Sequence, residues 1–199
     1  MAERLPDNPH HAAVLLIDVV NDFDFSGADS LLEQAIPAAH AIRKLRADAQ
    51  KLSVPVVYVN DNFGLWHSER REIVAHCLGP ESKGRPVVEI LAPERDDFFI
   101  IKPRHSGFYA TNLQVLLPYL EARRLVITGF ATDICVLFTA NDAYMRNYAI
   151  WVPADCTAAS TPERTRDALE LMAKIVKAET RATDALALAD WLREAPDEF

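Results

Sequence analysis

The sequence predicts an α/β fold, a three-layer α/β/α sandwich built on a mostly parallel, doubly wound sheet. Short apolar runs alternate with longer amphipathic stretches along the 199 residues. The runs are apolar at nearly every position, which is typical of strands that are buried on both faces of a parallel sheet. Strands and helices that alternate in this way indicate βαβ units with right-handed crossovers. We therefore expect one domain over residues 1–199, with its core at about 12–180.

Each expected element follows from its own pattern. Strands are expected where apolar and β-branched residues run together, at 13–17, 54–60, 98–102, 124–130 and 149–153. Helices are expected where apolar residues recur at helical spacing, at 30–52 with an interruption at Pro37, and at 111–121, 135–148, 162–176 and 183–194. Residues 62–97 break the alternation, and a segment of this length between two strands is usually a lid or an oligomer contact. We expect its early part to form a pocket wall.

Three of the expected strands lead into residues with chemical function. One apolar run ends at Asp18, a second ends at Lys102, and a third ends in a short turn that opens a helix at Cys135. Ligands collect at the carboxyl ends of the strands in an open parallel sheet, so we expect these residues on one edge. The first turn of a helix favours a thiolate, which predicts a nucleophile at Cys135. The alternative is that Cys135 is a small buried hydrophobe.

Three sequence blocks resemble the signature blocks of the isochorismatase-like cysteine hydrolases. They are DVVNDF at 18–23, KPRHSGFYATNL at 102–113 and GFATDICV at 129–136, in the order and spacing of that family. The resemblance covers roughly residues 12–180. It implies a catalytic triad of Cys135, Asp18 and Lys102, and a non-proline cis peptide between Phe130 and Ala131.

The chemistry of these residue types is that of an amidohydrolase. A thiolate attacks a carbonyl, and a nearby carboxylate takes the thiol proton and returns it to the leaving amine. Lys102 supplies the counter-charge that lets a carboxylate and a thiolate share a pocket. The backbone N–H groups of Ala131 and Cys135 are candidates for the oxyanion hole. We expect cleavage of a small amide, ureide or carbamoyl C–N bond through a thioester acyl-enzyme.

Aromatic residues near these blocks are candidates for the wall of the substrate pocket. Phe23 ends the first block, Phe108 lies in the second, and Trp66 lies early in the segment 62–97. Ligand pockets are mostly apolar with a few polar groups, so the sequence predicts that Phe23, Trp66 and Phe108 line the cleft. The alternative is that all three are ordinary core aromatics.

Three further polar residues lie near the expected triad in the sequence. Arg104 and His105 follow Lys102 and are candidates for contacting an anionic substrate, although Arg104 could instead pair with Asp22 or the lid. Asp133 is a candidate for either a helix N-cap or a pocket acid.

No metal site and no cofactor are predicted. Nicotinamidases, one branch of the family, carry an Asp-x-His pair after the second strand, and Phe63 stands here in place of that histidine. Asp61 and His67 would give only two ligands, which do not close a Zn²⁺ site, and a third from His76 would need the fold to bring it near.

Other functions remain open beside the cysteine amidohydrolase. A non-catalytic isochorismatase-like binding module is one, although the complete set of Asp18, Lys102 and Cys135 favours catalysis. The nicotinamidase branch is another, although Val20 stands where many relatives have glutamine. Hydrolysis of the vinyl ether isochorismate is a third, but members of that branch resemble this chain without the cysteine.

Composition predicts the setting in which the protein acts. The chain is 50% hydrophobic and 25% charged, as expected for a globular domain, and its net charge of −8 with scattered Lys and Arg argues against nucleic-acid binding. The polar start, the lack of a membrane-length apolar run and the odd number of three cysteines favour a cytoplasmic protein without membrane contact. We expect a small-molecule substrate. We also expect a homodimer or higher homo-oligomer, because residues 62–97 and the apolar stretch 185–192 offer surface that one sheet face does not cover.

Overall fold

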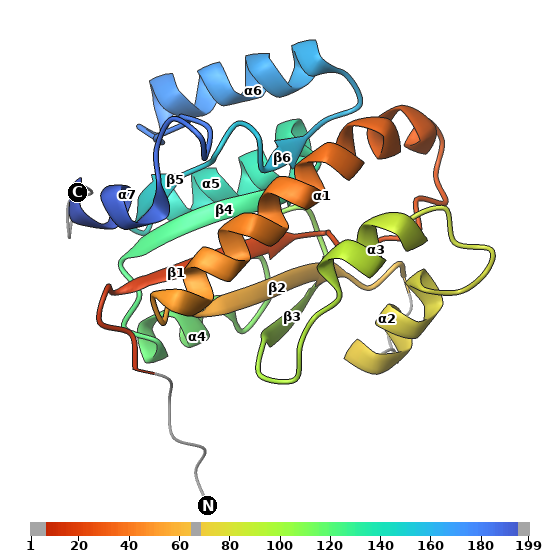
Figure 1. Cartoon of the computed structure of the whole chain (residues 1–199), viewed down its shortest axis with the longest axis horizontal. Coiled ribbons are helices and arrows are strands. Elements are labelled where there is room, and N and C mark those ends of the chain that lie inside the picture. The colour runs from red at the N-terminus through yellow and green to blue at the C-terminus, as the bar shows by residue number, and fades with distance from the viewer. Residues whose placement is uncertain (1–6, 65–68, 195–199) are drawn as a thin grey trace, which may run out of the picture.

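The computed structural model describes residues 7–64 and 69–194, and a six-stranded sheet lies at its centre (Figure 1). The strands are β1 (Ala12–Ile17), β2 (Val56–Asp61), β3 (Phe98–Lys102), β4 (Arg124–Phe130), β5 (Ala149–Trp151) and β6 (Thr157–Ala158). Their order is β3-β2-β1-β4-β5, and β6 pairs with the end of β4. All of these pairings are parallel, so the carboxyl ends of the strands lie on one edge.

Helices cover both faces of this sheet. They are α1 (Ala28–Lys51), α2 (Arg70–Cys77), α3 (Arg85–Leu91), α4 (Leu113–Tyr119), α5 (Leu137–Tyr144), α6 (Pro162–Ile175) and α7 (Leu188–Glu194), with a π turn, η1 (Thr132–Val136), before α5. In Figure 1, α1 and α3 lie in front of the sheet, and α4 and α5 lie behind it. The predicted three-layer α/β/α fold is thereby confirmed.

The central strand β1 shows why this arrangement is stable. Its six residues are all buried, and successive side chains point to opposite faces of the sheet. Val14 and Leu16 belong to the apolar cluster that includes α1 and α3. Leu15 and Ile17 belong to the cluster that includes α4, α5 and α6. Burial of each such side chain contributes about 1.5–3 kcal/mol, so a strand that is apolar throughout requires helices on both sides.

The first and last helices differ from the expected ones, and each difference has a physical cause. The first helix continues through Pro37 over 24 residues instead of breaking there. Proline removes one hydrogen bond of the helix, and the long buried face of α1 offsets this loss. The last helix begins at Leu188 and not at 183. Thr183 donates its backbone N–H to Asp155 Oδ1 at 2.9 Å, which holds the preceding residues as a loop.

The segment 62–97 contains the helices α2 and α3, which the sequence analysis did not predict. Arg46 of α1 holds its far end, because the guanidinium donates to Asp97 Oδ2 at 2.7 Å and to the carbonyl of Ala92 at 3.2 Å. The part of this segment that includes α3 is therefore packed against α1. Among the described residues, each helix is too short or too polar to span a bilayer.

Candidate active site

Asp18 directly follows β1 at the carboxyl edge of the sheet. Its backbone φ of 50° lies in the left-handed region and ends the extended strand. Its Oδ1 accepts the backbone N–H of Asp61, at the end of β2, at 2.8 Å. Only 6% of the residue is exposed, so this carboxylate is held at a fixed place between two strand ends.

Lys102 is the last residue of β3 and reaches across the end of β2. Its Nζ lies 2.8 Å from Asp18 Oδ2 and 3.5 Å from Cys135 Sγ, and it donates to the carbonyl of Arg104 at 3.1 Å. The residue is 1% exposed. The structure therefore brings together the three residues that the sequence placed at strand ends, with the ammonium group in contact with both the carboxylate and the sulfur.

The turn after β4 positions Cys135. The peptide between Phe130 and Ala131 is cis, as the resemblance implies. The turn η1 follows, in which the N–H of Val136 donates to the carbonyl of Ala131 at 3.2 Å, five residues back. The sequence analysis predicted one helix over 135–148 with the cysteine on its first turn. That prediction is corrected, because Cys135 lies inside the π turn and α5 begins only after it, at Leu137.

A glycine lets the two strands that carry the site approach each other. Gly129, in β4, has a φ of 107°, a conformation that other residues rarely adopt. A Cβ atom added there would lie 2.0 Å from the carbonyl oxygen of Ile17, its partner on β1. The absence of a side chain thus permits β1 and β4 to pair next to Asp18.

Burial controls the protonation of the triad. Burial raises the pKa of Asp18 above that of an ordinary carboxyl, and Lys102 opposes this rise. Burial, and then the charge of Asp18, raise the pKa of the Cys135 thiol. Burial disfavours the charged form of Lys102, but Asp18 and Cys135 outweigh it and raise the pKa of the ammonium group. These shifts favour a neutral thiol and a protonated lysine at rest, so burial outweighs the preference for a thiolate that was expected from the helix start. A base is required, and a carboxylate of raised pKa suits that role.

We expect iodoacetamide to modify Cys135 much faster than the other two cysteines. Cys135 is partly exposed, whereas Cys77 and Cys156 are fully buried. Burial raises the pKa of all three thiols, so access of the reagent to the sulfur is what separates them. Peptide mapping by mass spectrometry over a time course measures the three rates. Modification of Cys77 or Cys156 before Cys135 would contradict this accessibility.

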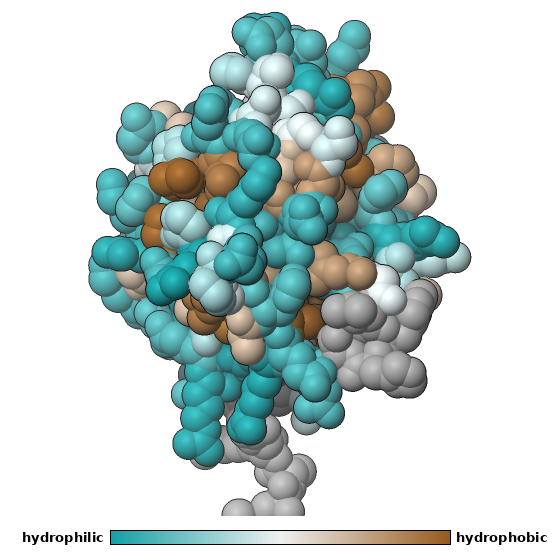
Figure 2. Space-filling model, turned by 90° about the vertical axis from the view of Figure 1, so that its right-hand side faces the viewer, coloured by the Kyte–Doolittle hydropathy of each residue, from teal (hydrophilic) through white to brown (hydrophobic). Residues whose placement is uncertain are grey.

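The thiol opens into a cavity of about 730 Å³ at the carboxyl edge of the sheet. Figure 2 shows the molecule from this side, where apolar side chains appear among hydrophilic ones. The cavity is lined by three groups of residues: the catalytic candidates Asp18, Ala131 and Cys135; the aromatics Phe25, Phe63 and Phe130; and polar residues that include Asp61, His105, Asp133 and Arg164. An apolar wall with a few polar groups is the usual composition of a small-molecule site.

The aromatic residues of the wall differ from those that the sequence suggested. Phe23 is fully buried in the cluster beneath α1, and Phe108 is buried in the cluster on the other face. Neither lines this cavity, so both have the alternative role of core aromatics. Trp66 lies outside the described residues. Sequence spacing could not separate these cases, because an aromatic residue next to a motif points into either the core or the cleft.

The described residues do not fit a metal ion. Asp61 Oδ1 accepts the N–H of Phe63 at 2.7 Å, and His76 Nε2 lies 2.8 Å from Asp22 Oδ2 and so pairs away from Asp61. Within residues 7–64 and 69–194, no group of three or more His, Cys, Asp or Glu side chains is placed to hold a metal. His67 lies outside the described residues.

Two further polar contacts at the cavity were not predicted. Asp133 is not the N-cap of the turn, which is Ala131, but it lines the cavity as the pocket acid of the two expected alternatives. It also pairs with the guanidinium of Arg164 from α6. His105 lies with its Nδ1 3.9 Å from Cys135 Sγ. The place of His105 three residues after Lys102 was a signal for nearness to the triad, whereas nothing in the sequence linked Arg164 to it.

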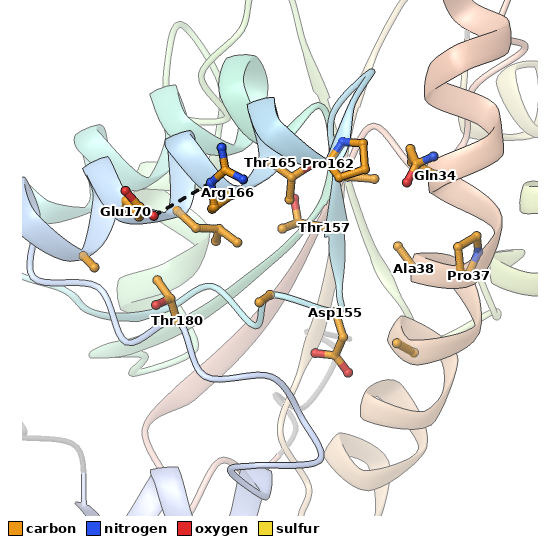
Figure 3. Close-up of a pocket in the computed structure, with 15 residues that line it drawn as sticks. Gln34, Pro37, Ala38, Asp155, Thr157, Pro162, Thr165, Arg166, Glu170 and Thr180 are labelled. Atoms are coloured by element: carbon orange, nitrogen blue, oxygen red, sulfur yellow. Dashed lines mark ion pairs between the residues drawn. The ribbon is translucent and has the colours of Figure 1, made fainter.

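A second cavity, of about 590 Å³, lies between α1 and α6 (Figure 3). Small side chains such as Ala38 and Ala158 form much of its wall, and Arg166 pairs with Glu170 at its edge at 4.0 Å. None of the described residues that line it is a cysteine, lysine or histidine. The first cavity, which Cys135 lines, is therefore the candidate active site.

The match to a known family agrees with this geometry. The family described as Isochorismatase domain matches residues 12–184, which is most of the chain. This chain belongs to the isochorismatase family. A family member from Bacillus subtilis (strain 168), the "Uncharacterized isochorismatase family protein YaaI", is 40% identical over 167 residues, which are 84% of this chain and 91% of that protein.

Other members of the isochorismatase family have named activities. The "Ureidoacrylate amidohydrolase RutB" of Serratia proteamaculans (strain 568) is 25% identical over 193 residues, which cover 83% of this chain and 77% of that one. The crystal structure of N-carbamoylsarcosine amidase from Thermoplasma acidophilum superposes with a TM-score of 0.67 at 27% identity, over 88% of this chain and 98% of that one. Both relatives are named for cleavage of C–N bonds outside peptides.

Proposed function

We propose that this protein is a cysteine amidohydrolase that cleaves a C–N bond of a small amide, ureide or carbamoyl compound. The observation that carries the proposal is the contact of Lys102 Nζ with both Asp18 and Cys135, at 2.8 Å and 3.5 Å, beside a cavity of small-molecule size. The amidohydrolases among its relatives support the same reaction class.

The proposed reaction begins with a proton transfer inside the triad. Asp18 takes the proton of the Cys135 thiol as the sulfur attacks the substrate carbonyl, and Lys102 holds the two anionic groups together. The backbone N–H groups of Ala131 and Cys135 are the proposed donors to the tetrahedral oxyanion; one such donor typically contributes about 3 kcal/mol. Asp18 then returns its proton to the nitrogen as the C–N bond breaks. Ammonia or an amine leaves, and a thioester on Cys135 remains for hydrolysis.

A panel of small amides, ureides and carbamoyl amino acids tests this proposal, with release of ammonia or amine as the readout. The wild-type protein should release ammonia from at least one class, and the Cys135→Ala protein should release none above background. Nicotinamide belongs in the panel, because its turnover would favour the nicotinamidase branch. Specific binding of a panel compound without turnover by the wild type would instead favour the non-catalytic module.

We expect hydrolysis to continue after exhaustive treatment with EDTA. In the proposed reaction Asp18 activates the thiol, Phe63 stands where a nicotinamidase has a histidine, and His76 pairs with Asp22. The rate of the best panel substrate, measured before and after dialysis against EDTA, checks this expectation. Loss of activity that Zn²⁺, Mn²⁺ or Fe²⁺ restores would show that the mechanism needs a metal.

A further inference from the structure

His105 lies on the outer side of the nucleophile, away from the buried ion pair. Its Nδ1 is 3.9 Å from Cys135 Sγ, and the residue is exposed and lines the cavity. Lys102 and Asp18, by contrast, are 1% and 6% exposed. The sulfur therefore has the carboxylate and ammonium groups on its buried side and an imidazole on the side where solvent enters.

The loop that carries His105 is tied to the turn that carries the thiol. The N–H of Gly107 donates to Thr139 Oγ1 at 3.0 Å, and the same hydroxyl donates to the carbonyl of Cys135 at 2.7 Å. Ser106 Oγ donates to Asp142 Oδ2 of α5 at 2.5 Å. The imidazole ring packs on Phe138 with 5.6 Å between the ring centroids. These contacts hold the imidazole in place, which a catalytic group requires.

The second half of the proposed reaction needs a base in this position. After the amine leaves, the acyl carbon stays bonded to Cys135 Sγ, and a water molecule must attack it from the open cavity. Asp18 also lines the cavity, but both of its oxygens already accept hydrogen bonds, Oδ1 from Asp61 and Oδ2 from Lys102. The imidazole of His105 lies on the cavity side, where a ring nitrogen can accept a proton from such a water.

We propose that His105 is a further catalytic residue, the base that activates water for hydrolysis of the thioester. This inference rests on the proposed function. As the water oxygen bonds to the acyl carbon, one water proton moves to His105. The C–S bond then breaks, its electron pair stays on sulfur, and His105 passes the proton to Cys135 Sγ. The products are a carboxylic acid, a neutral thiol and a neutral imidazole, so the cycle closes with Asp18 ionised as at its start.

The test uses p-nitrophenyl acetate, which transfers an acetyl group to a reactive thiol and whose phenolate leaves without needing a proton. Phenolate release measures acetylation of Cys135, and intact-protein mass spectrometry follows the loss of the acetyl group. His105→Phe keeps a ring against Phe138 without a titratable group, and His105→Gln keeps polarity. His40→Gln, at an exposed position of α1, is the matched control. Cys135→Ala reports acetylation at other sites.

In both His105 variants the acetylation rate should stay within about threefold of wild type, while loss of the acetyl group slows by about 100-fold, the lower end of general-base effects. The acetyl-enzyme should accumulate in these variants, and His40→Gln should match wild type. Equal deacetylation by wild type and both variants would overturn the role of His105 and leave the proposed function intact. Slower acetylation with unchanged deacetylation would also overturn it. A wild type that forms no acetyl-Cys135 would overturn the nucleophile assignment itself, and with it both proposals.

Discussion

Replacing Asp18 with asparagine is expected to lower the acylation rate by about 100-fold or more. Burial raises the pKa of the Cys135 thiol, so the resting sulfur is protonated and a poor nucleophile. The Asp18 carboxylate, held by the N–H of Asp61 at 2.8 Å, is the group that removes this proton in the proposed mechanism. Asparagine has nearly the same shape but does not accept the proton. Single-turnover kinetics with the best amide substrate measure the effect.

The control for this variant is Asp48→Asn, at an exposed position in the last turn of α1. It should have the wild-type rate. Thermal unfolding of both proteins separates lost chemistry from lost structure. A well-folded Asp18→Asn protein with a near wild-type acylation rate would remove Asp18 from the mechanism and leave it as a residue that ends a strand.

The double variant Asp18→Asn/Lys102→Met should be more stable than either single variant but no more active. In the wild type the two charges neutralise each other at 2.8 Å with almost no solvent contact. Removing one partner leaves a buried charge uncompensated, which typically costs about 3–5 kcal/mol, whereas two neutral side chains avoid that cost. Acylation, however, needs both groups for one step, so the loss of the second should add little to the loss of the first.

Urea unfolding and single-turnover acylation are measured on the wild type, the two single variants and the double variant. They give one coupling energy for stability and one for the acylation rate. The stability coupling should be large and favourable to the double variant. The kinetic coupling should show that the double variant is nearly as slow as the slower single variant. Additive effects on the acylation rate would mean that Asp18 and Lys102 act in different steps.

The part of the site that follows from topology could be predicted from the sequence. Asp18 and Lys102 end apolar strands, and parallel strands bring their carboxyl ends to one edge whatever the details of packing. The protonation state of Cys135 could not be predicted in the same way, because it depends on how deeply the folded chain buries the sulfur. The roles of Phe23 and Phe108 also depend on the face that each side chain meets, and a single aromatic residue in a loop carries no periodicity.

The wide turn that carries the nucleophile makes the site sensitive to chain length in a way that side-chain chemistry does not reveal. A π turn holds an extra residue relative to an α turn, and here the bond from Val136 to Ala131 encloses it. Each residue rotates a helix by about 100°, so deletion of Ile134 would aim the cysteine away from Lys102. Ile134 is 36% exposed, so its side chain can be replaced without disturbing a buried contact. In this stretch, substitutions should therefore be tolerated more readily than deletions or insertions, and variant libraries should keep the number of residues between Ala131 and Leu137 constant.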